Sequence, residues 1–163
     1  MGNGKQQNKT NDMRWVEYFR NLAHQVKLKS KDDNTQIGAI IVGKDKEIVS
    51  TGYNSFPRGL KDYESNRQQR PEKYFWFEHA ERNAIYNAAR IGVSTKGCTM
   101  YLSCGIPCCD CARGIINSGI RRIFCERGDT TKGAHWAENY ERSWEMLEEA
   151  GVNVQFYDEA YHV

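Results

Sequence analysis

The chain has 163 residues, of which 39% are hydrophobic, 27% charged and 12% aromatic, with a formal net charge of +2. This composition excludes a disordered chain, and no apolar run approaches the roughly 20 residues that cross a bilayer. The small net charge excludes the dense basic surface of a duplex-binding protein. The six cysteines are not needed as disulfides in a domain of this size, so we expect reduced thiols and a cytoplasmic location.

The first part of the chain predicts a tail, a helix and a hairpin. Residues 1–12 carry almost no apolar side chains, which predicts a disordered N-terminal tail before a single domain over residues 13–163. Apolar residues recur at three- and four-residue steps over residues 15–26, as in a helix with one buried face. The β-rich runs 37–42 and 47–51 predict a hairpin.

The remainder predicts alternating helices and strands. The segment 52–77 is irregular, and loops of that length in compact domains are usually functional. A hairpin followed by strand–helix alternation predicts an α/β protein, with a three-layer α/β/α architecture and a mixed five-stranded sheet. The predicted helices are 78–91, 108–117 and one with a buried stripe of Trp136, Tyr140, Trp144 and Leu147, and the predicted strands are 98–103, 121–125 and 152–157.

Two short motifs at predicted helix starts predict a zinc site. Cys108 and Cys111 are three residues apart, so they share a helix face and both sulfurs can reach one ion. The positive end of the helix dipole favours the thiolate form that metal binding requires. His79 supplies a third ligand, which leaves the fourth position open, as in catalytic zinc sites.

Glu81 follows His79 by two residues and can border the zinc without binding it. A carboxylate there can take a proton from an activated water and pass it to a ring nitrogen and a leaving amine. His-x-Glu followed by Pro-Cys-x-x-Cys is the signature of zinc nucleobase deaminases. The motifs therefore indicate hydrolytic deamination with one zinc ion.

Two other interpretations use the same residues. Cys104 or Cys109 could fill the fourth position and close a structural zinc site, which would make the chain a non-catalytic interaction module. A deaminase of the same fold could instead act on a free nucleoside or on tRNA. The glutamates of the last long helix oppose stable nucleic-acid binding, because they would repel a phosphate backbone.

The chain resembles the cytidine deaminase superfamily, and within it the deoxycytidylate (dCMP) deaminases. The resemblance runs from Met13 to about Tyr157. It rests on four motifs, SKDDNTQIGA from Ser30, GYN with PRG from Gly52, HAERNAI from His79, and PCCDCA from Pro107. It implies conversion of dCMP and water to dUMP and ammonia, a homohexamer, activation by dCTP and inhibition by dTTP, with Mg²⁺ accompanying a triphosphate effector.

The resemblance also implies roles for individual residues. Ala80 offers its backbone N–H to the base carbonyl, Asn54 meets the deoxyribose hydroxyl, and Ser103 lines the base pocket. The 5′-phosphate lies near Ser30, Lys31 and Asn34. Effector binding and subunit contacts are implied for Ser55, Phe56, Arg58 and Arg90.

The segment 67–76 departs from the family pattern because it is longer and more basic than in some members. Some phage members carry a second, structural zinc in this segment. Here it contains neither a cysteine nor a surplus histidine. We therefore expect a single zinc ion.

Overall fold

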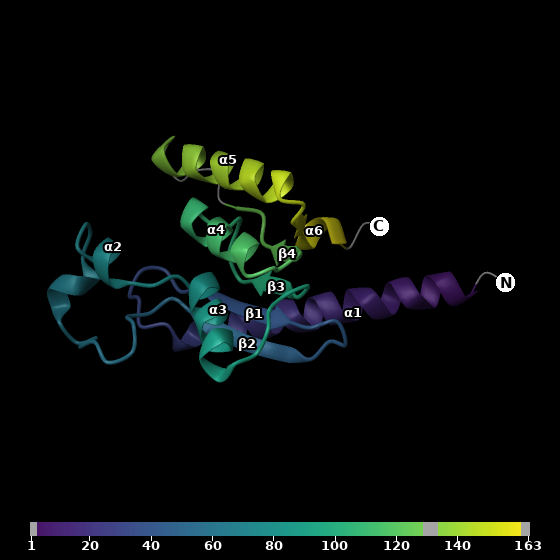
Figure 1. The fold of residues 1–163 in the computed structure, drawn as a ribbon, viewed down its shortest axis with the longest axis horizontal. Helices are drawn as coiled ribbons and strands as arrows, with labels where there is room; N and C mark the ends of the chain where they lie inside the picture. The colour runs from purple at the N-terminus through teal and green to yellow at the C-terminus, as the bar shows by residue number, and fades with distance from the viewer. Residues whose placement is uncertain (1–2, 129–133, 161–163) are drawn as a thin grey trace.

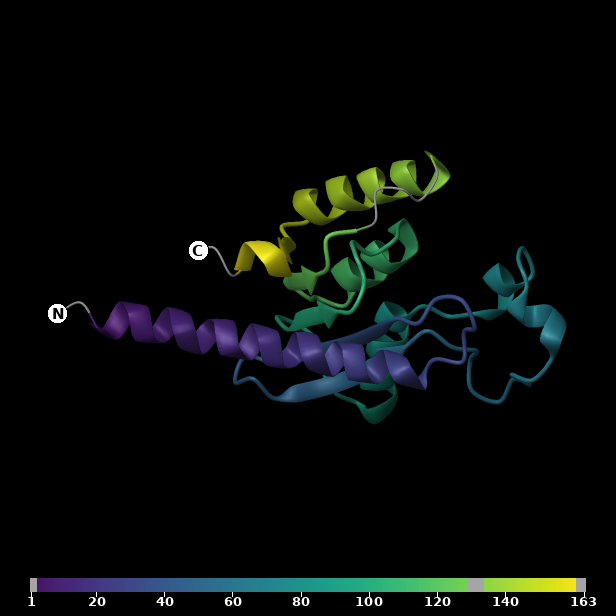
Figure 2. The same cartoon turned by 180° about the vertical axis from the view of Figure 1, so that it is seen from behind.

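The structure of the chain, a computed structural model, describes residues 3–128 and 134–160. One sheet runs through its centre, and helices lie against both faces (Figures 1 and 2). The strands are β1 (Gly38–Val42), β2 (Ile48–Tyr53), β3 (Thr99–Leu102), β4 (Arg122–Cys125) and β5 (Asn153–Phe156). Their order is β2-β1-β3-β4-β5, with β1 antiparallel to β2 and β3, and β3, β4 and β5 parallel.

The helices divide between the two faces of the sheet. They are α1 (Asn3–Val26), α2 (Lys73–Trp76), α3 (Ala80–Ile91), α4 (Cys109–Asn117), α5 (Ala134–Glu149) and α6 (Tyr157–Ala160), with 3₁₀ turns η1 (Lys27–Lys29) and η2 (Ser65–Gln68). Side chains of α1 and α6 pack on one face, and side chains of α3, α4 and α5 pack on the other. The predicted three-layer α/β/α fold with a mixed five-stranded sheet is confirmed.

Strand β1 shows why the core has two halves. All of its residues are buried, and successive side chains in a strand point to opposite faces. Ala39 and Ile41 join the cluster below α3 and α4, whereas Ile40 and Val42 join the cluster below α1. A strand covered on both faces has no polar side, which explains its uninterrupted apolar sequence.

The N-terminal boundary differs from the prediction. The predicted disordered tail, residues 1–12, is helical from Asn3 onward and continues into the packed part of α1. Once a helix has formed, each added residue gains one hydrogen bond, and Lys and Gln are good helix formers. Residues 1–2 of the predicted tail and residues 161–163 of the predicted domain lie outside the described part.

The predicted stripe of α5 is only partly buried. Leu147 is fully buried and packs on α4, but Trp144 is 36% exposed and stacks on Phe156 at 6.1 Å between ring centroids. The prediction that Trp144 lies in the core is therefore wrong. Helix α5 lies on α4 at the outside of the molecule. The side of α5 that carries Trp144 packs against the short strand β5.

Gly52 allows α3 to lie close against β2. A Cβ atom at this position would come within 2.3 Å of the Ala84 nitrogen and 2.4 Å of the Ala80 oxygen, both backbone atoms of α3. Neither atom can move without displacing the helix that carries the site. The Gly52–α3 contact therefore fixes the distance between that helix and the sheet.

We expect Gly52→Ala to lower the free energy of unfolding by about 3 kcal/mol, the upper part of the range for overpacking. Urea unfolding followed by circular dichroism measures this loss. Gly128→Ala is the matched control, because a Cβ atom there meets nothing within 4 Å. Equal stability of the two variants would contradict the close approach.

Candidate active site

His79, Cys108 and Cys111 converge where α3 and α4 begin. His79 Nδ1 lies 3.4 Å from the Sγ atom of each cysteine. All three ligand atoms lie within 4.8 Å of one another, and no other group of this kind occurs among the residues that the structure describes. Two thiolates and an imidazole form a donor set that zinc prefers. These residues therefore fit one zinc ion, as the spacing predicts.

Hydrogen bonding within this group favours a thiolate. The Cys111 thiol beside Cys108 lowers the pKa of Cys108 to about 4, with His79 adding to the effect and burial opposing it. The same bond raises the pKa of Cys111. The Cys108 sulfur raises the pKa of His79 to about 9 against the effect of burial. A thiolate beside a helix N-terminus is the state that a metal ligand needs.

Glu81 lies in the first turn of α3 and is only 4% exposed. Its Oε2 atom is buried and has no hydrogen-bond partner among the described residues. Burial raises the pKa of this carboxyl, and the nearby His79 acts in the opposite direction. An unpaired buried oxygen is costly unless a polar group comes to it, so Glu81 is suited to receive a reacting polar group.

Three polar residues that the resemblance assigns to substrate binding, Asn54, Ser30 and Ser103, are held by hydrogen bonds to the backbone of neighbouring segments. The Asn54 side chain accepts from the Ile37 N–H at 2.8 Å and donates to the Thr35 oxygen at 2.7 Å. The Ser30 hydroxyl donates to the backbone oxygen of Asn54 at 2.8 Å. Ser103 Oγ accepts from the backbone N–H of Gly38 at 2.9 Å. These bonds fix the loop between η1 and β1 in place.

A buried ion pair that sequence reasoning missed anchors the same loop. Lys73 of α2 and Asp32 are 6% and 4% exposed, and their Nζ and Oδ2 atoms are 2.7 Å apart. Burial alone would raise the pKa of Asp32, but Lys73 and the N–H groups of Asn34 and Thr35 lower it below its ordinary value. The only sequence signal was a lysine beside an aromatic run.

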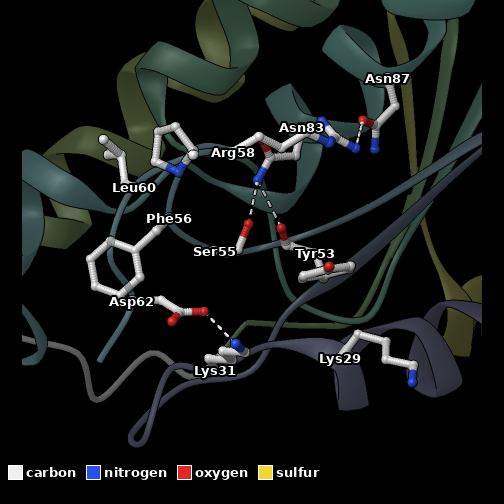
Figure 3. A pocket seen from close by; sticks show the side chains of 12 residues that line it. Lys29, Lys31, Tyr53, Ser55, Phe56, Arg58, Leu60, Asp62, Asn83 and Asn87 are labelled. Carbon is white, nitrogen blue, oxygen red and sulfur yellow. Dashed lines mark hydrogen bonds and ion pairs between the residues drawn. The ribbon is translucent and has the colours of Figure 1, made fainter. Parts of the chain in front are cut away.

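A pocket of about 240 Å³ opens between η1, the 53–62 segment and α3. Lys31, assigned to the substrate phosphate, lines it together with the predicted effector residues Ser55, Phe56 and Arg58 (Figure 3). Lys31 pairs with Asp62, and Arg58 donates to Asn87 at 2.7 Å. The predicted residues Asn34 and Arg90 are exposed and do not line this pocket.

Residues 13–127 match the family model described as the cytidine and deoxycytidylate deaminase zinc-binding region. The chain belongs to this family. It is similar to an uncharacterized deaminase of Aliivibrio fischeri, with 36% identity over 86% of this chain and 92% of that protein. Human deoxycytidylate deaminase is 38% identical over 69% of this chain and 64% of the human protein. The chain thus aligns with less than two thirds of this human family member.

Solved structures of family members share the fold. The apo dCMP deaminase of cyanophage S-TIM5 has a TM-score of 0.67 and 22% identity, covering 86% of this chain and 95% of that chain. The same cyanophage enzyme in complex with dCMP and dUMP has a TM-score of 0.60, covering 92% of this chain and 96% of that chain. No helix in the described part of this deaminase-family chain is long and apolar enough to span a membrane.

We expect Cys108→Ser to abolish stoichiometric zinc binding, because the serine hydroxyl does not ionise and replaces a thiolate ligand. Metal analysis of the purified protein after dialysis measures the zinc content. Cys109→Ser is the matched control, since Cys109 is outside the ligand group and its hydroxyl replacement can still donate to the Asn139 oxygen. Full zinc content in the Cys108 variant would remove Cys108 from the site.

We expect Lys73→Met to destabilise the fold by about 3–5 kcal/mol near neutral pH, because it leaves the Asp32 carboxylate buried without its cation. A lowered folded-state pKa stabilises the fold above the ordinary value of 3.8, and this contribution is lost as the pH falls through the lower folded-state value. The difference from the unchanged chain should therefore shrink on acidification.

Urea unfolding near neutral pH and in acid measures this difference. The exposed Lys61→Met in the same segment is the control, with little effect expected at either pH. A Lys73→Met loss that does not change with pH would contradict the ion-pair explanation.

Proposed function

We propose that the chain catalyses the hydrolytic deamination of dCMP to dUMP and ammonia. The observation that carries the proposal is the buried, unpartnered Glu81 Oε2 next to the His79, Cys108 and Cys111 donor set. Family membership supports the reaction class. The relatives named deoxycytidylate deaminase, from human and from phage T4, support the substrate, as does the cyanophage structure with dCMP and dUMP.

In this proposal the metal ligands and Glu81 have different roles in the reaction. When bound, zinc supplies a Lewis acid that activates water for attack on C4 of the cytosine ring. Glu81 takes a proton from that water at Oε2, delivers it to N3, and transfers the second proton to the departing amino group. Water and dCMP are thereby converted to dUMP and ammonia. A raised carboxyl pKa helps Glu81 to hold each proton between transfers.

Backbone and loop groups orient the substrate in this proposal. Ala80 is the first residue of α3, and N–H groups of a first helical turn have no intrahelical acceptor. Its N–H is therefore suited to bind the base carbonyl. Asn54 binds the deoxyribose hydroxyl, and Ser103 lines the base pocket. Both are already held rigidly by backbone hydrogen bonds.

The 5′-phosphate is assigned to Ser30, Lys31 and Asn34. The Lys31 ammonium and the Asn34 side chain are exposed on the loop that the Lys73–Asp32 pair anchors. A phosphate favours a lysine with short hydroxyl or amide donors. The Lys31 ammonium pairs with Asp62, so it would have to leave that carboxylate to bind the substrate phosphate.

The pocket in Figure 3 is assigned to the effectors dCTP and dTTP. Lys29, Lys31 and Arg58 line it and can supply cations for phosphates, and Phe56 contributes an aromatic side chain to its wall (Figure 3). Mg²⁺ would accompany a bound triphosphate. Arg90 lies outside the pocket, and we assign it to the contact between subunits of a homohexamer.

Two alternatives are less well supported. A tRNA deaminase needs a cationic surface, whereas the exposed side of α5 is acidic, with Glu138, Glu141, Glu145, Glu148 and Glu149 all exposed. This surface opposes stable binding of a nucleic acid, so we assign a free nucleotide as the substrate. A purely structural zinc module gives no reason for a buried, unpartnered Glu81.

We expect Glu81→Gln to lower the kcat for dCMP by at least about 100-fold, because an amide cannot shuttle protons. Ammonia release at saturating dCMP measures the rate. Zinc content should stay at one ion per chain, since Glu81 is not a member of the ligand group. Undiminished turnover with zinc bound would contradict the proton-shuttle role.

We expect Lys31→Ala to raise the KM for dCMP much more than the KM for deoxycytidine, because only the nucleotide carries a phosphate. Arg58→Ala should leave the dCMP KM without effectors near its original value and abolish the response to dCTP and dTTP. Steady-state kinetics on both substrates, with and without effectors, measures these differences. Equal effects of Lys31→Ala on both substrates would remove Lys31 from the phosphate site.

A further inference from the structure

Helix α4 begins at a residue that cannot cap it. The first N–H groups of a helix have no intrahelical acceptor, and a Ser, Thr, Asp or Asn side chain usually supplies one. Here Cys108 occupies the N-cap position and makes no capping bond. Its sulfur instead lies 3.4 Å from His79 Nδ1. The turn that carries the metal ligands therefore needs an acceptor from elsewhere in the fold.

Helix α5 supplies this acceptor and two further bonds. Asn139 Oδ1 accepts from the Cys109 N–H at 2.9 Å, and the Asn139 backbone oxygen accepts from the Cys109 thiol at 3.0 Å. Four residues further along α5, the Ser143 hydroxyl donates to the Pro107 oxygen at 2.6 Å. Residues four apart lie on one helix face. The three bonds therefore restrain Cys108 on both sides, because they fix Pro107 before it and Cys109 after it.

The contact is half-buried at Asn139, fully buried at Ser143, and continues into the core. Ser143 is 0% exposed, and one turn further on Leu147 packs in the same cluster as Ala112 and Ile115 of α4. Both views show α5 lying along α4 (Figures 1 and 2). The family match ends at residue 127, whereas α5 begins at Ala134. The bonds to the ligand turn thus come from outside the matched region.

We propose that Asn139 and Ser143 are positioning residues that hold the 107–109 turn in the conformation in which Cys108 and Cys111 bind zinc. Asn139 replaces the missing N-cap of α4, and Ser143 fixes the carbonyl that precedes Cys108. Loss of either bond lets the turn take up conformations that separate the two sulfurs. The inference rests on the zinc site of the proposed function and is independent of the identity of the substrate.

The test measures zinc affinity of the full chain by competition with a chromophoric chelator. We expect Asn139→Ala and Ser143→Ala each to weaken zinc binding about tenfold or more, the scale seen when groups that orient metal ligands are removed. Asn139→Asp keeps an acceptor for the Cys109 N–H, and a negative charge is favourable at a helix N-terminus. Its zinc affinity should therefore return close to that of the unchanged chain.

Thr95→Ala is the matched control. Thr95 Oγ1 donates to the backbone oxygen of Ser118, the C-cap of α4, at 2.8 Å, so this change also removes one hydroxyl bond to the backbone, at the opposite end of the helix. Thermal unfolding of the zinc-free variants shows any general loss of stability. If Asn139→Ala and Ser143→Ala weaken zinc binding no more than Thr95→Ala does, the proposal is wrong. Absence of dCMP turnover with the expected zinc affinities would overturn only the proposed substrate.

Discussion

The structure depends on bringing the starts of two helices together at one end of a sheet. His79 is the N-cap of α3 and Cys108 the N-cap of α4, and neither side chain makes a capping bond. Both are turned instead toward a common point, within 3.4 Å of each other. Two helix N-termini provide a positive potential that favours thiolate and other anionic groups. The same arrangement leaves the first turns short of acceptors, which other residues must provide.

The two helices obtain hydrogen-bond acceptors for these N–H groups from different parts of the chain. At α3 the neighbouring Glu78 accepts from the His79 N–H at 2.9 Å and also binds Arg82. At α4 the acceptor comes from a separate helix, through Asn139. The first solution is local in sequence, and the second depends on how α5 packs. The stability of α5 on the sheet and the geometry of the ligand turn are therefore linked.

The sequence was sufficient where short-range spacing determines the geometry. The three-residue separation of Cys108 and Cys111, the order of the strands and helices, and the ligand group follow from periodicity and from motifs at helix starts. The Lys73–Asp32 pair and the Asn139 contact could not be predicted, because each joins residues that only the tertiary fold brings together. Trp144 was misplaced because an apolar helix position does not reveal how wide the covering sheet is.

The long segment between β2 and α3 contributes to the site through the loop that precedes β1. Lys73 reaches Asp32, Gln68 donates to the Lys31 oxygen at 2.9 Å, and Asp62 pairs with the Lys31 ammonium. These contacts connect the segment that lines the pocket proposed for effectors with the loop proposed for the substrate phosphate. Under the proposed regulation, a nucleotide bound in the pocket would act on substrate binding through this short chain of polar contacts.

The most direct test of the account is ammonia release by the zinc-loaded protein from dCMP, CMP, deoxycytidine and a short tRNA substrate containing adenosine, compared with the same protein after removal of zinc by a chelator. We expect turnover of dCMP well above that of the other three, lost with the metal and restored by zinc. Turnover of dCMP that persists without zinc, or zinc-dependent turnover of one of the other substrates alone, would contradict the account.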